Sequence, residues 1–255
     1  MSTDLDQLAR QRMRRARTVG ALLAVLVAAS AFILLRGNRQ ESEPAVPRPS
    51  ASLTASATPA TPAPASGYVA PARWTALPEA RDRIGRDYPV GWPRTPQGAA
   101  AAAAAMFASV WNLDVSRATG AVDVYFGDGD QAASRRDAAA STAWLRELLA
   151  LPRDGAPPPG ATVAVQPLGV QWRIVDADNL FVSVAMRIDM IAGTAAPLQT
   201  LTVASTGHLR WQPGLRGGDW VVLRTPSARM PRPAFAEPGS AAFNRGRWRA
   251  IRPGG

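Results

Sequence analysis

Cysteine and lysine are absent from this chain of 255 residues, and histidine occurs only once. Without cysteine there are no disulfides, no thiolate metal ligands and no cysteine nucleophile. A single histidine without cysteine also argues against a zinc site. Because lysine is missing, all 29 basic residues are arginine, and against 19 acids they give a net charge of +10.

The motifs that bind nucleotides or build a catalytic triad are missing as well. There is no GxxxxGK[ST] loop and no GxGxxG after a predicted strand. The single histidine, His208, has Ser205 nearby, but a separation of three residues on a strand puts the two side chains on opposite faces. We therefore expect His208 to be an outward-facing strand residue. We predict no catalytic, cofactor-binding or metal-binding residues and no cofactor.

Carboxylates are the remaining candidates for chemistry. Asp114, Asp123 and Asp189 are the acids that a hydrolase or isomerase could pair. Asp189, however, lies beside Arg187 on the polar face of a predicted strand, where a surface ion pair is expected. The sequence FGDGDQ at 126–131 resembles part of a calcium loop, but the other ligand positions are absent. A turn that caps the following helix is the preferred interpretation.

The longest uncharged apolar stretch is residues 18–35, TVGALLAVLVAASAFILL. As a helix it would rise about 27 Å, close to the hydrocarbon thickness of a bilayer, and its all-round apolar surface disfavours a buried soluble helix. Five arginines precede it in residues 1–17, so the positive-inside rule places the N-terminus in the cytoplasm and the rest outside. A cleaved signal peptide is the alternative, because Ala29-Ser30-Ala31 fits a small-x-small pattern. The apolar run continues to Leu35, which favours an uncleaved single-pass anchor in the cell membrane.

Composition divides the rest of the chain. Residues 1–17 form a cytoplasmic basic arm of net charge +3, and residues 36–90 form a linker rich in Pro, Ala, Ser and Thr. Such a linker cannot bury enough apolar surface to offset its ordering entropy, so we expect it to be mostly disordered, with a short helix near 77–88. Residues 91–225 form the extracytoplasmic domain, whose near-zero charge argues against direct nucleic-acid binding. Residues 226–255 carry a charge of +5 and form a basic tail.

The basic tail contains the one candidate interaction site. Its arginines surround a tryptophan, and the proposed contact residues are Arg245, Arg247, Trp248, Arg249 and Arg252. This cluster is suited to anionic lipid headgroups or to an acidic partner. The alternative is a solvated, disordered tail.

Within residues 91–225 the hydrophobic period changes from helical to extended. Thr95 is a good N-cap and Pro96 suits a first helical position, so a helix is predicted over 99–111. Further helices are predicted over 118–125 and 131–151, and strands over 162–175, 181–191, 201–211 and 219–224. The strand at 162–175 should bend at Pro167-Leu168-Gly169. Helices followed by an antiparallel meander of about four strands predict an α+β fold with helices packed on a curved sheet.

Two stretches carry a resemblance to a known family: GWPRTPQGAAAAAA at 91–104, and Gly218-Asp219-Trp220 at the start of the last predicted strand. They resemble segments of membrane-anchored actinobacterial proteins linked to conjugative elements. In layout the chain is similar to the bitopic inner-membrane assembly proteins of type IV secretion systems. The resemblance implies a nuclear-transport-factor-2-like domain and a non-catalytic role, and it transfers no functional residues. The layout is also similar to membrane-anchored accessory proteins of actinobacterial lipid-uptake systems.

Three functions remain open at this point. The first is a non-enzymatic scaffold or assembly component of an envelope-spanning complex for conjugative, type IV secretion-like transfer. Its expected partners are the membrane, other membrane proteins of the complex and further copies of the chain. The second is a ligand-binding or enzymatic domain that uses the cavity between helix and sheet. The third is an accessory role in lipid uptake.

Overall fold

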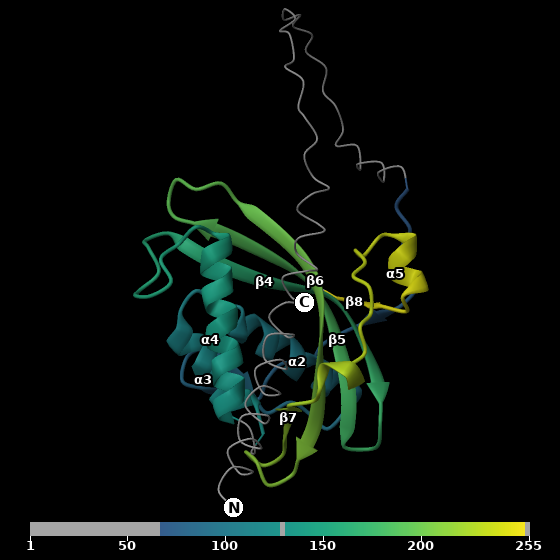
Figure 1. The fold of residues 1–255 in the computed structure, drawn as a ribbon. Helices are drawn as coiled ribbons and strands as arrows, with labels where there is room; N and C mark the ends of the chain where they lie inside the picture. The colour runs from purple at the N-terminus through teal and green to yellow at the C-terminus, as the bar shows by residue number, and fades with distance from the viewer. Residues whose placement is uncertain (1–66, 128–130, 253–255) are drawn as a thin grey trace, which may run out of the picture.

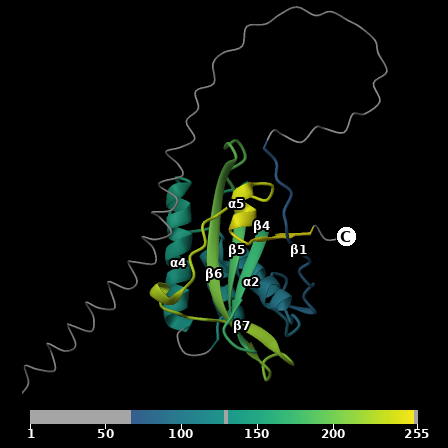
Figure 2. The same cartoon turned by 90° about the vertical axis from the view of Figure 1, so that its right-hand side faces the viewer.

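The computed structural model describes residues 67–127 and 131–252, which form a curved sheet with helices packed on it (Figure 1 and Figure 2). The helices are α2 (Pro96–Val110), α3 (Val115–Tyr125), α4 (Gln131–Leu148), the 3-10 turn η1 (Ser227–Arg229) and α5 (Ala241–Arg245). The strands are β1 (Trp74–Thr75), β2 (Asp82–Ile84), β3 (Tyr88–Val90), β4 (Ala161–Ile174), β5 (Asn179–Ala192), β6 (Gln199–Gln212), β7 (Asp219–Leu223) and β8 (Arg249–Ile251).

Several predictions fall outside the described residues: the basic arm, the anchor at 18–35, most of the linker, and the two aspartates of the FGDGDQ turn, Asp128 and Asp130. Among the helices that are described, none is long and apolar enough to cross a bilayer.

The predicted antiparallel meander is confirmed. Strands β4, β5, β6 and β7 are consecutive neighbours, and each begins and ends within two residues of its predicted bounds. The register between β4 and β5 shifts between Pro167 and Gly169, where the bend was predicted. The sheet is larger than predicted, however, and it is mixed. Its order is β1-β8-β4-β5-β6-β7, with β1 parallel to β8.

The first predicted helix is confirmed as α2, which packs on the sheet through its alanines. The Thr95 hydroxyl oxygen caps the helix by accepting a hydrogen bond from the Gly98 backbone N–H at 3.0 Å, and Pro96 occupies the first turn. A side chain at Gly98 would collide with the Pro93 carbonyl, so the chain turns tightly into the helix. The alanines from Ala99 to Ala104 are at most 6% exposed. Their small side chains let the helix axis approach the sheet closely.

The short helix predicted near 77–88 is wrong. These residues contain an antiparallel hairpin of β2 and β3, and Gly85 in its turn has φ +61°, outside the helical region. The Arg81 guanidinium fixes the hairpin by donating to the carbonyl oxygens of Gly91 at 2.6 Å and Gly218 at 3.0 Å. The spacing of apolar residues was compatible with a helix, but these long-range bonds and the glycine turn favour the hairpin. The folded domain therefore begins well before residue 91.

Asp219 joins the start of the helical layer to the last strand of the meander. Its fully buried carboxylate accepts hydrogen bonds from the backbone N–H groups of Gly91 at 2.9 Å and Trp92 at 3.3 Å. The Trp220 indole N–H donates to the Pro93 carbonyl at 2.9 Å. Bonds of this kind to a buried carboxylate are charge-assisted and strong. The two sequence stretches that carry the family resemblance therefore meet in space.

Residues 226–252 do not form a solvated tail. They pack on the sheet face opposite α2, which we call the outer face, and β8 adds to the sheet beside β4. Phe243 and Trp248 are 0% and 1% exposed and pack with Ala185 of β5. The physical reason is that Ala185 adds an apolar group to this second face of β5, and the aromatic residues of the C-terminal segment bury it. Residues 67–252 contain 21 Arg and 15 Asp or Glu, so the folded domain has a charge of +6, although residues 91–225 alone are neutral.

Candidate functional site

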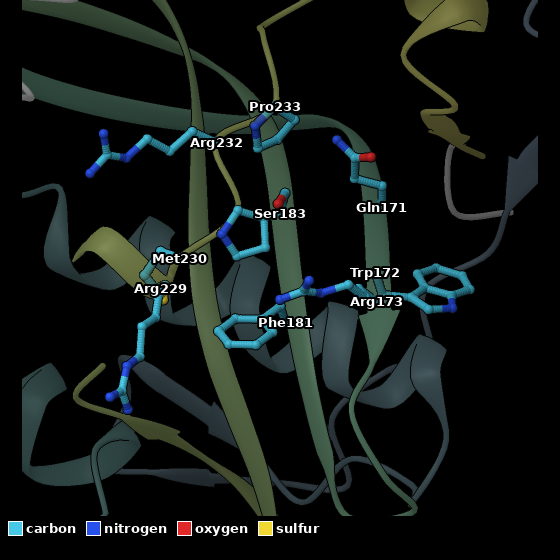
Figure 3. A pocket seen from close by; sticks show the side chains of 10 residues that line it. Gln171, Trp172, Arg173, Phe181, Ser183, Arg229, Met230, Arg232 and Pro233 are labelled. Carbon is cyan, nitrogen blue, oxygen red and sulfur yellow. The ribbon is translucent and has the colours of Figure 1, made fainter. Parts of the chain in front are cut away.

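The outer face carries an open groove between the sheet and residues 229–233, which we call the strap (Figure 3). The strap begins at Arg229, the last residue of η1, and crosses the outer face in front of β5 and β6 (Figure 1). Two of its five residues, Pro231 and Pro233, have no backbone N–H to give to a sheet ladder, which suits a segment that crosses strands without joining them. The hollow beneath it has a volume of about 460 Å³.

Three side chains from neighbouring strands form a stacked row on the floor of the groove. The strand register places Arg173 of β4 opposite Phe181 of β5, and Phe181 opposite His208 of β6. The Arg173 guanidinium carbon lies 4.8 Å from the Phe181 ring centroid, and the His208 ring stacks on Phe181 with centroids 4.4 Å apart. The cation–π contact holds the arginine head over the sheet. Figure 3 shows Arg173 and Phe181 side by side below the strap.

The next row along the strands is polar and uncharged. Gln171 lies opposite Ser183, and Ser183 lies opposite Thr206. The two hydroxyl oxygens are hydrogen-bonded at 2.6 Å. The Gln171 amide nitrogen Nε2 is buried and has no hydrogen-bond partner. A buried donor without a partner costs about 1–3 kcal/mol, so this amide marks a place where a bound group would complete the site.

The third row closes the groove. Ala185 lies opposite Ala204, and both contribute to the outer-face core formed with Phe235, Ala236 and the aromatic residues of the C-terminal segment. The polar floor therefore ends where the buried C-terminal core begins.

A second hollow, of about 590 Å³, lies on the other side of Phe181, at the β7 end of the sheet. Phe181 and Arg229 line both hollows, so the two are adjacent. Ser134 of α4 and Thr225, just after β7, also line the second hollow. The groove as a whole crosses the outer face from β4 to the end of β7.

His208 contributes a second unpartnered group to this groove. Its Nδ1 is hydrogen-bonded to the Thr225 hydroxyl at 2.8 Å, while its Nε2 is buried without a partner. Burial lowers the pKa of His208, and Arg210 lowers it further, whereas Asp176 acts in the opposite direction. The ring is therefore neutral at pH 7, and it can present one ring nitrogen to a ligand.

Arginine is the only charged residue type among the residues that line the two hollows: Arg173, Arg224, Arg229 and Arg232. Arg224 pairs with Asp137 at 3.1 Å. The other three form no ion pair with any residue in the described part of the chain. The groove thus offers guanidinium groups and hydrogen-bond donors, and no acid on its walls opposes an anionic ligand.

The structure does not bring the five predicted interaction residues of the C-terminal segment together on one surface. Trp248 is buried, and its indole N–H donates to the Ala234 carbonyl at 3.3 Å, so it cannot insert into a membrane surface. The Arg249 guanidinium lies 4.5 Å from the Trp172 ring centroid. The exposed members of the set are Arg245, Arg247 and Arg252. What the C-terminal segment supplies to a site is instead the strap.

The carboxylates have structural roles in the described chain. Asp114 caps α3 by accepting from the Ser116 backbone N–H at 2.8 Å, and Asp123 pairs with an arginine of α4 at 2.6 Å. The predicted ion pair of Asp189 with Arg187 is confirmed at 3.4 Å. Within residues 67–127 and 131–252, no three His, Asp or Glu side chains gather as a metal site.

Sequence reasoning missed this groove, although one signal was present. Phe181 and Arg173 share the outer face with Gln171 and Ser183, so the outer face of β4 and β5 alternates aromatic, cationic and polar residues instead of being uniformly polar. The alternation reveals the face, but only the strand register shows that these residues are neighbours.

Comparisons with protein-family models, with curated proteins and with solved structures found no match to this chain. The functional argument therefore depends on the fold and on the geometry of the groove.

Proposed function

We propose that this chain is a non-enzymatic, membrane-anchored assembly component of an envelope-spanning complex, of the kind that carries out conjugative, type IV secretion-like transfer. The observation that carries the proposal is the groove on the outer face, which combines arginines with an unpartnered amide donor and an unpartnered histidine ring nitrogen. An open, donor-rich groove is suited to holding a segment of another protein. In this proposal the apolar run at residues 18–35 is the membrane anchor. The resemblance of residues 91–104 and 218–220 to conjugation-linked proteins suggests the kind of complex.

The packing between helix and sheet supports this proposal over a domain that works through an internal cavity. Ala100 and Ala103 of α2 are 0% exposed, and so are Val184 and Met186 of β5, which share the same core. Side chains without exposed surface leave no room for a ligand or substrate beside them. The first hollow described above lies instead on the outer side of the sheet, and the second lies at its β7 end, where Ser134 of α4 also lines it.

The proposal is tested by deleting the gene in its native strain and measuring transfer of a conjugative element. Transfer should fall by at least a hundredfold and return with the full-length gene. A variant in which residues 1–35 are replaced by a cleavable secretion signal should not restore it, because the domain would be exported without its anchor.

Unchanged transfer after deletion would overturn the proposal. Loss of lipid uptake with normal transfer would favour the lipid-uptake alternative. Restoration by the secreted, unanchored domain would contradict the role given to the membrane.

A further inference from the structure

The shape of the groove selects an extended ligand. Its two hollows are adjacent and share Phe181 and Arg229, and together they are lined by residues from four adjacent strands, β4 to β7. At about 4.8 Å between neighbouring strands, this crossing is about 14 Å long. Six residues of extended chain span about 20 Å, enough to cover the whole groove. A compact metabolite would occupy one hollow and leave the other empty.

The chemistry of the walls selects an acidic ligand. Arg173 and Arg229 belong to a set of four lining arginines, and no aspartate or glutamate lines either hollow. The unpartnered amide of Gln171 lies at one end of the floor, and the unpartnered ring nitrogen of His208 lies towards the other. Carboxylates satisfy guanidinium groups in a bidentate way, and the backbone carbonyls of a peptide satisfy amide donors.

The aromatic residues of the groove argue against a single-stranded nucleic acid. Proteins that bind unpaired bases stack them on open aromatic faces. Here Phe181 lies between Arg173 and His208, which stack against it from the two neighbouring strands. Trp172 is covered by the Arg249 guanidinium and points away from the strap (Figure 3). The rings therefore position cations and leave no ready platform for bases.

We infer that the occupant of the groove is an extended, acidic peptide segment of a partner protein. Its carboxylates meet Arg173, Arg229 and Arg232, and an oxygen of the peptide accepts from the Gln171 amide. The inference rests on the proposed function and names the chemistry of the partner that this function requires.

The test measures binding of fluorescein-labelled hexaglutamate to the full-length chain in phosphatidylcholine nanodiscs at 0.15 M salt, by fluorescence anisotropy. Hexaglutamine is the neutral control peptide. The decisive variant is Arg229→Gln with Arg232→Gln. Its matched control is Arg245→Gln with Arg247→Gln, which removes the same charge from exposed positions outside the groove.

The groove variant should weaken hexaglutamate binding at least tenfold, and the control variant should change it less than twofold. Gln171→Leu should weaken binding three- to tenfold without any change of charge, which a diffuse electrostatic attraction cannot produce. Equal weakening by the two double variants, or none by either, would overturn the inference. So would displacement of the peptide at lower concentrations by a dodecamer of deoxythymidine or by phosphatidylglycerol vesicles, which would identify a nucleic acid or a lipid surface as the ligand.

The same variants separate this inference from the proposed function. If hexaglutamate fails to bind but gene deletion still abolishes transfer, only the acidic peptide is excluded. If hexaglutamate binds as expected but deletion leaves transfer intact, the groove has this ligand class and the transfer role is wrong. Thermal unfolding by circular dichroism checks that both double variants remain folded.

Discussion

The two faces of the sheet are covered in different ways. On the inner face α2 and α4 pack against the even-numbered residues of β5, and Val184, Met186 and Ile188 are 0% exposed. On the outer face a C-terminal segment with little regular structure covers only part of the same strand. Where that segment packs tightly, around Trp248, the outer face is as buried as the inner one. Where it narrows to the strap, polar and charged residues line a groove instead of a closed core.

This difference suggests that the inner face contributes mainly to stability and the groove on the outer face mainly to binding. The inner face buries small and branched apolar groups at high density, so its substitutions should act through packing. The groove on the outer face holds two unpartnered polar nitrogens and several like charges, which a chain selected for stability alone would avoid. Such local conflicts are expected where a surface serves a ligand.

The largest expected effect tests whether the closed part of the outer face is a true core. Trp248→Ala should lower the free energy of unfolding by about 3–5 kcal/mol, because it removes a fully buried indole. Leu145→Ala on the inner face should lower the free energy of unfolding by about 2–5 kcal/mol, because it also removes a buried apolar side chain. Urea unfolding of both variants, followed by far-ultraviolet circular dichroism, gives the comparison. A loss below about 1 kcal/mol for Trp248→Ala would mean that the C-terminal segment is not part of the core.

The next effect tests how tightly the inner face is packed. Ala103→Leu adds three carbons at a position of α2 that is 0% exposed, and overpacking should cost about 1–3 kcal/mol. Ala108→Leu, on the exposed side of the same helix, is the matched control and should change stability by less than about 0.5 kcal/mol. Thermal and urea unfolding measure both. A neutral Ala103→Leu would indicate unfilled space between helix and sheet and revive the cavity alternative.

A smaller change in the free energy of unfolding, this time an increase, is expected for a substitution in the groove. Gln171→Leu removes a buried amide nitrogen that has no partner, so it should raise the free energy of unfolding by about 1 kcal/mol. The same variant should bind hexaglutamate more weakly, which couples a gain in stability to a loss of binding. Destabilisation by Gln171→Leu would contradict the assignment of an unsatisfied donor at this position.

The smallest effect concerns pH. The pKa of His208 in the folded chain is lowered from 6.5, chiefly by burial, so the unfolded chain binds more protons once the pH falls below about 6.5. Stability should therefore decrease as the pH falls from about 6.5 through the lower folded pKa. His208 is the only histidine, so His208→Gln should flatten this part of the profile. Unfolding midpoints at pH 7.5 and 5.0 test this, and equal pH dependence in wild type and variant would contradict it.

The elements that local chemistry defines were predictable. Thr95 and Pro96 predict the start of α2. The alternation of apolar and polar residues predicts β5 and β6, and Asp189 pairs with Arg187 as expected. Each of these features depends on residues close together in the sequence. That is why periodicity and capping were sufficient to find them.

The elements that depend on distant partners were not predictable. Arg81 reaches Gly91 and Gly218, and these bonds belong to a hairpin where a helix was expected. The C-terminal segment is predicted from sequence to be a basic tail, because its apolar residues follow no helical or strand period. It is ordered by β4 and β5, whose outer side it covers.

The sequence by itself determined the order of the helices and strands from α2 to β7, the α+β class and the excess of arginine at the C-terminal end. Only the tertiary structure decided where that arginine lies. Folding the C-terminal segment onto the outer face brings Arg229 and Arg232 to Arg173 and Phe181, far away in the chain. The physical reason is that strand register and burial of the second face of β5 are long-range interactions, which no local pattern encodes.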